Sequence, residues 1–509
     1  MKRDSQLKAG AVLSYVSLGI TSLISILYTP VMLRLLGKSE YGLFNLANSV
    51  IGYLGVLDFG LSNAVIRYTA RYRALDDKEG EENLYGMFIF LYSLLAILIV
   101  IVGLGFVATS NAFFGNTLTS VELHKIKILM IIMIFNLAIS FPGGVFAGII
   151  TAYERFVFPK IMTIVRAILN PFIMLPLLFM GYKSIAITIA TTILNIAVIL
   201  INIYYCFAKL NIKIKLKRIN FALLKEVIGY SFFIFLNIIM DKVYWSTDQF
   251  ILGSVLGTTS VAVYSVASTL NTYYMSFSTA ISGVLLPKVT QMVTKNVDDK
   301  ELSNLFIRIG RIQYIIMTAI LGGFLVVGKE FILLWAGKDY GNAFYITLAI
   351  MIPLTIPLVQ NVGVLILQAK NMNQFRSIIL IVIAVVNVVI SIPMAKIFGG
   401  FGCALASGMC FVIGTGFIMN IYYKRKLGID IKRFWINIIQ LTIPIIISVV
   451  STIIGTSFFD LSSSISIIVK GVIYIILYSS IVVKIGLNKY EKSMILNFLR
   501  ISKRREGCV

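Results

Sequence analysis

Five ionisable side chains lie well inside apolar stretches of this chain, where a charge is costly. They are Asp58, Arg166, Asp241, Lys242 and Asp248. A charge at the centre of a bilayer costs from about 3 to over 10 kcal/mol, so each group should face a hydrated interior or an opposite charge. Cations in such a place can bind an anionic ligand, and carboxylates can bind a proton or a metal cation. These five residues are therefore the candidate site.

The two signs of charge predict two roles. Arg166 and Lys242 are the candidates for binding an anionic substrate, whereas the three aspartates are candidates for binding a coupling ion or for charging a cavity. Asp241 and Asp248 are seven residues apart, about two turns, so they share one face of their helix. Structural ion pairs among these groups are an equally good explanation. For Asp248, near the end of its stretch, a structural role is favoured.

The sequence does not provide the residues that catalysis or a metal site would need. His124 is the single histidine and has no Cys or His partner nearby in the sequence, and no GxSxG, Walker A or HExxH motif occurs. The four cysteines show no CxxC or paired pattern; they are Cys206, Cys403, Cys410 and Cys508. We therefore predict that the chain is not an enzyme and binds no metal or other cofactor, except a coupling ion, H⁺ or Na⁺.

About fourteen apolar stretches, each of roughly 20 or more residues, position these groups. A helix of that length crosses a bilayer core of roughly 30 Å. With 58% hydrophobic and 13% charged residues, the chain could not keep its apolar surface out of water as a globule. The expected fold is an all-α polytopic membrane protein. The predicted spans are 11–36, 41–66, 84–108, 126–150, 156–180, 184–208, 227–252, 260–286, 307–327, 343–368, 377–395, 403–423, 434–454 and 465–485.

Lysine and arginine gather in alternate loops between these stretches. Basic loops remain cytoplasmic, so the pattern predicts that both termini are cytoplasmic and that the number of spans is even. The net charge of +23 lies in short segments beside apolar spans, which favours contact with anionic membrane lipids over binding of nucleic acid. We expect a multi-pass membrane protein.

A weak internal repeat links the two parts of the chain. At an offset of about 220 residues, Leu36-Gly37 recurs as Leu256-Gly257. A repeat of six spans predicts two halves of the same membrane orientation around a central cavity. The expected organisation is an N-terminal half at 1–208, a basic cytoplasmic linker at 209–226, a C-terminal half at 227–425, and two additional helices with a basic tail at 426–509.

Prolines and terminal charges add two further expectations. Pro171, Pro176, Pro353 and Pro357 lie inside apolar stretches, where each could be either a flex point or a static kink. Arg311 lies at a span end, where the expected role is snorkelling to the lipid headgroups.

Two segments resemble bacterial polysaccharide flippases of the multidrug, oligosaccharidyl-lipid and polysaccharide exporter superfamily. The first runs from Leu36-Gly37 to Phe44 and is followed by Leu57-Asp58-Phe59-Gly60-Leu61 and Arg67. The second is Asp248-Gln249-Phe250-Ile251-Leu252-Gly253, then Leu256-Gly257 and Val263-Tyr264-Ser265. Span count and loop lengths extend the likeness over nearly the whole chain.

This resemblance implies a flippase that moves undecaprenyl-pyrophosphate-linked oligosaccharide, such as an O-antigen or capsule repeat unit, to the outer leaflet of the inner membrane by ion-coupled alternating access. We hypothesise that Arg166 and Lys242 attract the pyrophosphate, while Asp58 or Asp241 binds the coupling proton or sodium ion. The alternatives are a lipid II flippase of peptidoglycan synthesis and a non-transporting scaffold for polysaccharide assembly. Expected partners are the lipid-linked oligosaccharide, anionic membrane lipids, a polysaccharide polymerase and glycosyltransferases, and no nucleic acid.

Overall fold

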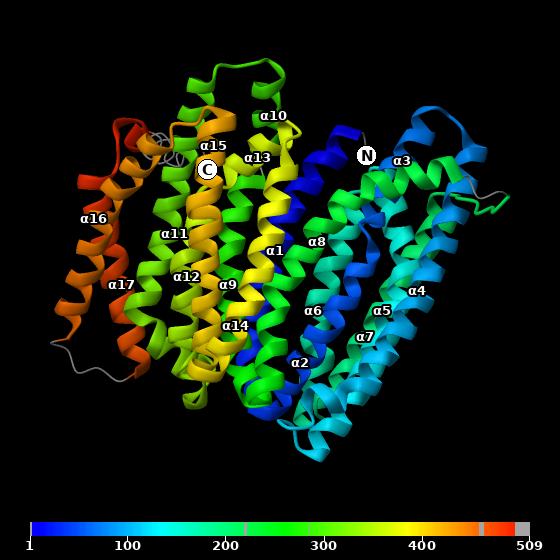
Figure 1. Ribbon diagram of the computed structural model, residues 1–509, viewed down its shortest axis with the longest axis horizontal. Coiled ribbons are helices and arrows are strands. Elements are labelled where there is room, and N and C mark those ends of the chain that lie inside the picture. The colour runs from blue at the N-terminus through cyan, green and yellow to red at the C-terminus, as the bar shows by residue number, and fades with distance from the viewer. Residues whose placement is uncertain (1–2, 218–220, 284, 458–462, 494–509) are drawn as a thin grey trace, which may run out of the picture. The chain divides into compact units, whose positions relative to one another are not determined.

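The computed structural model describes residues 3–217, 221–283, 285–457 and 463–493, and this part of the chain is almost entirely helical, with no strand (Figure 1). The chain forms two compact units, each described below by itself. The first contains residues 1–265 and 384–403, and the second contains residues 266–383 and 404–509. Two helices, α9 (Thr258–Gly283) and α14 (Asn373–Phe411), contribute residues to both units.

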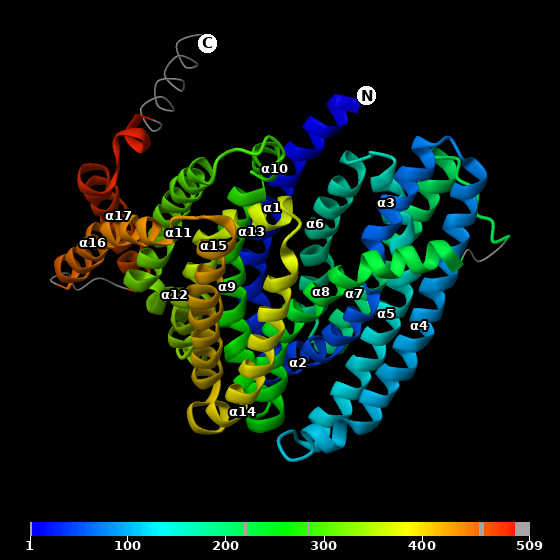
Figure 2. The same ribbon diagram turned by 45° about the horizontal axis from the view of Figure 1, so that its top comes forward.

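The first unit is a bundle of long helices. In Figures 1 and 2, α4, α5 and α7 run side by side, and α1 packs on α6. The helices are α1 (Arg3–Leu36), α2 (Lys38–Leu54), η1 (Gly55–Asp58), α3 (Leu61–Ala74), α4 (Lys78–Phe114), α5 (Ser120–Ala152), α6 (Val157–Phe179), α7 (Ser184–Lys209) and α8 (Phe221–Leu256), together with parts of α9 and α14.

The second unit is built around α11, which packs against α12, α16 and α17. A buried apolar core that includes Phe306, Tyr423 and Phe434 joins α11, α15 and α16. The elements are α10 (Leu286–Thr294), α11 (Asp299–Trp335), η2 (Lys338–Tyr340), α12 (Ala343–Val359), α13 (Asn361–Ala369), η3 (Val412–Ile418), α15 (Met419–Leu427), α16 (Ile431–Thr456), α17 (Ser463–Ile481) and η4 (Val482–Gly486), together with the rest of α9 and α14.

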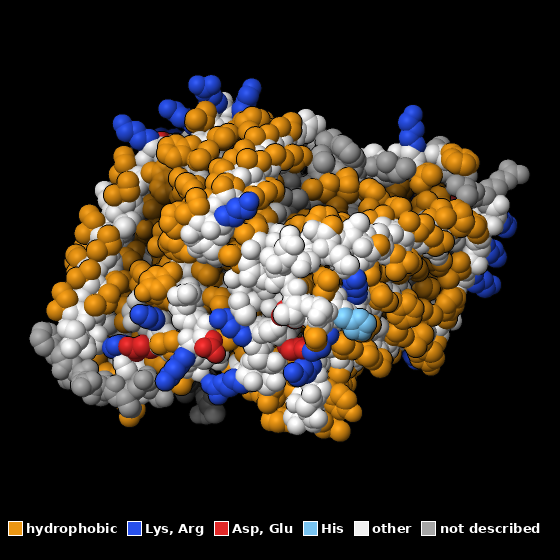
Figure 3. All heavy atoms as spheres, turned by 60° about the horizontal axis from the view of Figure 1, so that its bottom comes forward, with side chains coloured by type: hydrophobic (Ala, Val, Ile, Leu, Met, Phe, Trp, Pro, Cys, Tyr) orange, Lys and Arg blue, Asp and Glu red, His pale blue; other side chains and the backbone are white. Residues whose placement is uncertain are grey.

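The outer faces of these helices are apolar. Large hydrophobic side chains such as Phe172, Ile468 and Leu27 are 72%, 68% and 64% exposed, and hydrophobic side chains cover much of the surface in Figure 3. Exposed apolar surface on this scale is stable only where lipid is the solvent. The chain is a multi-pass membrane protein.

The predicted number of fourteen spans is not confirmed. Ten helical segments of the described chain are long and apolar enough to cross a membrane, or up to eleven with α12 and α13 taken together. The segment Asn373–Leu427 counts as one, although Gly399, with φ 61°, interrupts its helix. The predicted span at 227–252 includes side chains outside the described part of the chain, and α9 is rich in Ser, Thr and Tyr.

Polar residues fix where several helices begin. The side chain of Asp77 accepts a hydrogen bond from the Gly80 amide at the start of α4. Thr119 and Glu122 form a capping box at the start of α5, in which each side chain accepts from the other residue's backbone amide. Such caps satisfy amides that have no partner within the helix.

The four candidate prolines fall into two pairs with different effects on their helices. Helix α6 continues through both Pro171 and Pro176. Pro353 and Pro357 lie inside α12, which ends two residues after Pro357, and α13 follows at an angle of 42°. A proline removes one backbone hydrogen bond of its helix, which makes a bend of this kind cheaper to form.

Of the basic linker predicted at 209–226, residue 209 ends α7, residues 221–226 begin α8, and the segment 210–217 between these helices is docked on α4. The Lys215 amide donates to the Glu82 carbonyl at 3.1 Å, and the Lys215 ammonium pairs with the Glu82 carboxylate at 2.6 Å. Lys217 pairs with Glu79 at 2.6 Å. A methyl group on Gly86 would lie 2.3 Å from the Lys215 carbonyl oxygen, so this close approach requires glycine. Part of the cationic charge of the linker is therefore neutralised by α4.

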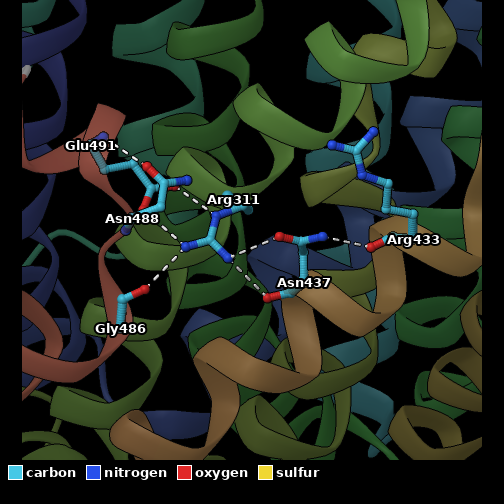
Figure 4. Close-up of polar contacts among 6 residues, drawn as sticks. All are labelled: Arg311, Arg433, Asn437, Gly486, Asn488 and Glu491. Atoms are coloured by element: carbon cyan, nitrogen blue, oxygen red, sulfur yellow. Dashed lines mark hydrogen bonds and ion pairs between the residues drawn. The ribbon is translucent and has the colours of Figure 1, made fainter. Parts of the chain in front are cut away.

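Arg311 forms a buried ion pair, so the prediction that it snorkels to the headgroups is wrong. Its Nε and Nη2 donate to the two carboxylate oxygens of Glu491 at 2.7 and 2.9 Å, and the two side chains are only 6% and 3% exposed. Nη1 donates to the carbonyl and side-chain oxygens of Asn437, and Nη2 donates to the Gly486 carbonyl at 3.0 Å (Figure 4). The guanidinium thus ties α11 to α16 and to the chain after α17.

We expect Glu491→Gln to lower the stability of the protein strongly. Removing one partner of a buried ion pair leaves the other charge uncompensated, which costs about 3–5 kcal/mol. Thermal unfolding of the purified protein in detergent measures the loss. Arg433→Met is the matched control, because it removes an exposed hydrogen bond to Asn304 and should change stability by about 0.5 kcal/mol or less. Equal unfolding temperatures for Glu491→Gln and the parent protein would contradict a stabilising pair.

Candidate functional site

Asp58 lies at a break in the predicted second span. Helix α2 continues into the short helix η1, which ends at Asp58, and Phe59 and Gly60 then adopt φ values of 51° and 71°. Helix α3 starts at Leu61. The span predicted at 41–66 lies within the segment Lys38–Ala74, which is long and apolar enough to cross a membrane, but its helix is interrupted at this point. Gly60 has no Cβ and so adopts the left-handed conformation without strain.

The Asp58 carboxylate is partly exposed and accepts hydrogen bonds from hydroxyl groups. Oδ1 accepts a hydrogen bond from the Tyr92 hydroxyl at 2.8 Å and another from Ser62 Oγ at 2.9 Å. Among the described residues its partners are uncharged. The explanation by an ion pair with another candidate residue therefore finds no support at Asp58, whose negative charge is not neutralised by these contacts.

Arg166 projects from α6 and is held by a chain of uncharged polar groups. Its Nη1 donates to Asn195 Oδ1 at 3.3 Å. The amide nitrogen of Asn195 donates to Asn136 Oδ1 and to Ser140 Oγ, both at 2.7 Å. These two contacts fix the orientation of the Asn195 amide, so that its oxygen faces the guanidinium. One turn further along α6, the buried Oδ1 of Asn170 has no hydrogen-bond partner.

Arg166 keeps most of its hydrogen-bonding capacity available. The side chain is exposed, and within the described parts of the chain it makes one hydrogen bond and no ion pair. A guanidinium has five N–H donors in a planar fork that matches carboxylate and phosphate geometry. The arrangement can therefore bind an anion.

Lys242 and Asp241 are adjacent on α8. The side chain of Asp241 lies outside the described residues. Lys242 is half-buried and faces α2 at Gly52, where an added methyl group would lie 3.9 Å from the Lys242 ammonium. Among the residues that the structure describes, Lys242 makes no hydrogen bond or ion pair. Its ammonium group can therefore also bind an anionic ligand.

Asp248 is only 1% exposed and lies among α8, the start of α9 and α14. Its Oδ2 accepts a short hydrogen bond from the Tyr264 hydroxyl, and its Oδ1 lies 3.1 Å from Ser391 Oγ. Ser391 Oγ also lies 3.2 Å from Asn387 Oδ1. A hydroxyl donates one proton only, so Ser391 shares it between two acceptors. The result is a buried cluster of oxygen atoms around a carboxylate.

Asp58 and Asp248 have the same kind of surroundings, which the sequence analysis did not foresee. Each carboxylate is contacted by one tyrosine hydroxyl and one serine hydroxyl. Tyr264 stands in the second of the two resembling segments, but it carries no charge to mark it. A polar side chain inside an apolar stretch, such as Asn195, is the signal that could have identified the network at Arg166.

The two Leu-Gly motifs of the sequence form similar turns in the first unit. Gly37 and Gly257 adopt φ values of 79° and 83°. Glu122 Oε1 accepts hydrogen bonds from Ser39 Oγ at 2.5 Å and from Thr258 Oγ1 at 2.8 Å, so one carboxylate holds the residues that follow both glycines. Gly42 lies against this junction, since a methyl group added to it would lie 1.9 Å from the Thr258 carbonyl oxygen.

The described residues contain no group of three or more His, Cys, Asp or Glu that could hold a metal ion. His124 is exposed near the start of α5. Cys206, Cys403 and Cys410 are buried thiols, as expected of packing residues, and Cys508 lies outside the described part of the chain.

Two relatives of known description match part of the chain. The protein named "Probable low-salt glycan biosynthesis flippase Agl15" of Haloferax volcanii is 25% identical over 215 residues, which cover 42% of this chain and 44% of that protein's length. The protein named "Putative O-antigen transporter" of Shigella flexneri is 23% identical over 344 residues, 65% of this chain and 78% of the relative.

Solved structures show the same fold at low sequence identity. A structure of the lipid II flippase MurJ in an inward closed conformation matches with a TM-score of 0.76 at 16% sequence identity. The match covers 92% of this chain and 98% of the MurJ chain. An inward-facing multidrug resistance transporter of the MATE family and MOP superfamily matches with a TM-score of 0.69 at 14% sequence identity. The match covers 83% of this chain and 99% of the transporter chain. The chain therefore has the same fold as these two solved structures.

A family described as polysaccharide biosynthesis protein matches residues 7–293, which is more than half of the chain. The matched region contains all five candidate residues and both Leu-Gly turns. The multi-pass helical fold agrees with this match, and the chain therefore belongs to the polysaccharide biosynthesis protein family.

Proposed function

We propose that this protein is a flippase for undecaprenyl-pyrophosphate-linked oligosaccharide repeat units, of the O-antigen or capsule type, and that it moves them across the bacterial inner membrane by alternating access. Family membership and the names of two relatives support transport of a lipid-linked glycan. In the proposed topology both termini are cytoplasmic.

The observation that supports the proposal most strongly is that Arg166 has an uncharged hydrogen-bond partner and no opposite charge among the described residues. A guanidinium in an apolar helix of a membrane protein is costly unless it faces water or an anion. Arg166 has an amide oxygen at 3.3 Å as its partner in the described chain and no carboxylate that neutralises it. A pyrophosphate supplies the missing negative charge, and two parallel N–H···O bonds are the geometry that a guanidinium offers to a phosphate.

Lys242 completes the proposed site as a second cation on another helix of the first unit. The Lys242 side chain is half-buried and faces Gly52 of α2. A flexible ammonium can follow a headgroup as it moves, whereas the fork of Arg166 sets the orientation. The polyprenyl tail of the substrate remains in lipid, against the apolar outer faces of the helices.

We further propose that Asp248 binds the coupling ion, H⁺ or Na⁺, with Asp58 as a second proton or ion site. Hard cations such as Na⁺ prefer oxygen ligands. Asp248 offers a carboxylate beside the oxygen atoms of Tyr264 and Ser391 in a site that is almost completely buried. Asp241 stays a candidate for the same role.

The likeness to the lipid II flippase is one of fold and does not by itself favour lipid II as the substrate. Full-length protein in liposomes with fluorescent lipid-linked oligosaccharide tests the proposal. Movement of the oligosaccharide lipid, and slower movement of lipid II, is the expected result. No movement of either lipid would favour a scaffold that recruits a polymerase or glycosyltransferases, and preferential movement of lipid II would favour the peptidoglycan pathway.

Arg166→Ala and Lys242→Ala should each abolish surface polysaccharide in cells, while the amount of protein in the membrane stays the same. A charge-assisted hydrogen bond contributes about 1.5–3 kcal/mol, so the loss in liposome transport should be about tenfold or more. Arg166→Lys keeps the charge and should retain part of the activity. Lys183→Ala is the control, because Lys183 is an exposed lysine at the start of α7. Normal polymer in both alanine variants would refute these roles.

Asp248→Asn should remove the dependence of transport on an ion gradient, because the amide cannot bind a proton or carry the charge that holds Na⁺. Transport is measured in liposomes under an imposed Na⁺ gradient or pH gradient. We expect the parent protein to be accelerated by one of these gradients and the variant by neither. Asp339→Asn, at an exposed position in η2, is the matched control. A gradient response that survives in Asp248→Asn would exclude this residue as the ion site.

A further inference from the structure

A groove of about 430 Å³ in the second unit combines an apolar wall with a polar end. Its wall includes Val412, Phe417 and Ile421, and its polar end is formed by Asn420, Lys424 and Trp435. This volume falls within the usual range for small-molecule sites. The groove lies between η3, α15 and the first turns of α16, outside the residues that match the family.

The local backbone makes room for the groove. η3 is a π-helix, a rare wide turn that is often found at functional sites. Gly416 lies in this turn, and a methyl group added to it would be 3.7 Å from Ile356 on the opposite wall, at ordinary contact distance. A methyl group here would already contact the opposite wall, so the groove is narrow at Gly416 and depends on the absence of a side chain.

The polar end offers a cation, two donors and one buried acceptor. The Lys424 ammonium is exposed and the Trp435 ring is half-buried, and neither side chain donates a hydrogen bond to the described protein. Asn420 is 7% exposed; its Nδ2 donates to the Gly416 carbonyl at 2.5 Å, but its buried Oδ1 has no donor. Asn420 and Lys424 are four residues apart, so they lie on one face of α15, about 6 Å apart along its axis.

We propose that this groove binds an anionic phospholipid of the phosphatidylglycerol kind. An acyl chain fits the apolar wall, and the phosphate accepts hydrogen bonds from Lys424 and Trp435. Charge complementarity favours this occupant, because Lys424 is followed by Arg425 and Lys426 in the last turn of α15. A phosphatidylcholine headgroup has no O–H or N–H donor and no net charge.

Native mass spectrometry of the delipidated full-length protein, titrated with phosphatidylglycerol or phosphatidylcholine, tests the site. We expect the parent protein to prefer phosphatidylglycerol. Lys424→Ala should weaken that binding about fivefold, the effect of one lysine near an anionic headgroup. Lys426→Ala removes the same charge from the same turn without touching the groove, and should weaken binding less than about twofold.

A second pair of variants tests the apolar wall. Gly416→Leu places a side chain in the groove and should reduce binding of phosphatidylglycerol, whereas Gly455→Leu, in open space on α16, should leave it unchanged. Unchanged unfolding temperatures establish that each variant is folded. Equal effects of Lys424→Ala and Lys426→Ala, or equal binding of the two phospholipids, would overturn the proposal. Tighter binding of polyprenyl phosphate than of phosphatidylglycerol would do so as well and would assign the groove to the tail of the transported lipid.

Discussion

The free-energy cost of an unsatisfied polar group in apolar surroundings is the constraint on which this structure depends. With lipid outside, every backbone break and every charge must find a partner in the protein, in water or in a bound ligand. The helix break at Phe59-Gly60 occurs where the Asp58 carboxylate meets the hydroxyls of Ser62 and Tyr92. At this point a helix break and a charge thus occur together: the hydroxyls satisfy the carboxylate, and backbone hydrogen bonds from Phe59 to Val56 and from Asn63 to Gly60 satisfy part of the broken helix.

The protein holds its internal charges in two different ways. Arg311 and Glu491 neutralise each other in a fully hydrogen-bonded pair, which fixes helices and leaves no charge for a ligand. Asp58 is instead contacted by the hydroxyls of Ser62 and Tyr92, which stabilise a carboxylate without cancelling its charge, and hydroxyls contact Asp248 as well. The first arrangement suits a permanent join between helices. The second suits a group that must gain and lose a cation.

Hydropathy predicted most of the helices, because long apolar runs have no other stable form in lipid. The runs at 84–108, 126–150 and 184–208 all lie within observed helices. The break at Phe59 was not predictable, since phenylalanine is not typical of a left-handed turn.

The charged residues of the candidate site could be predicted from the sequence, but the side chains that form hydrogen bonds or ion pairs with charged residues could not. The role of Arg311 was missed because its partner lies 180 residues away, while its position near a helix end is typical of snorkelling. Asn195 was missed because it is uncharged, although it is the side chain that holds Arg166.

The contact between Gly42 and the Thr258 carbonyl has a consequence for how this family can vary. Any side chain at position 42 would have to push α2 away from the turn that precedes α9, and with it the Ser39 and Thr258 hydroxyls that converge on Glu122. Helix positions that face lipid can exchange one apolar residue for another over evolutionary time. Position 42 has no such freedom, so related sequences that keep this junction should keep glycine there even where the surrounding residues have diverged beyond recognition.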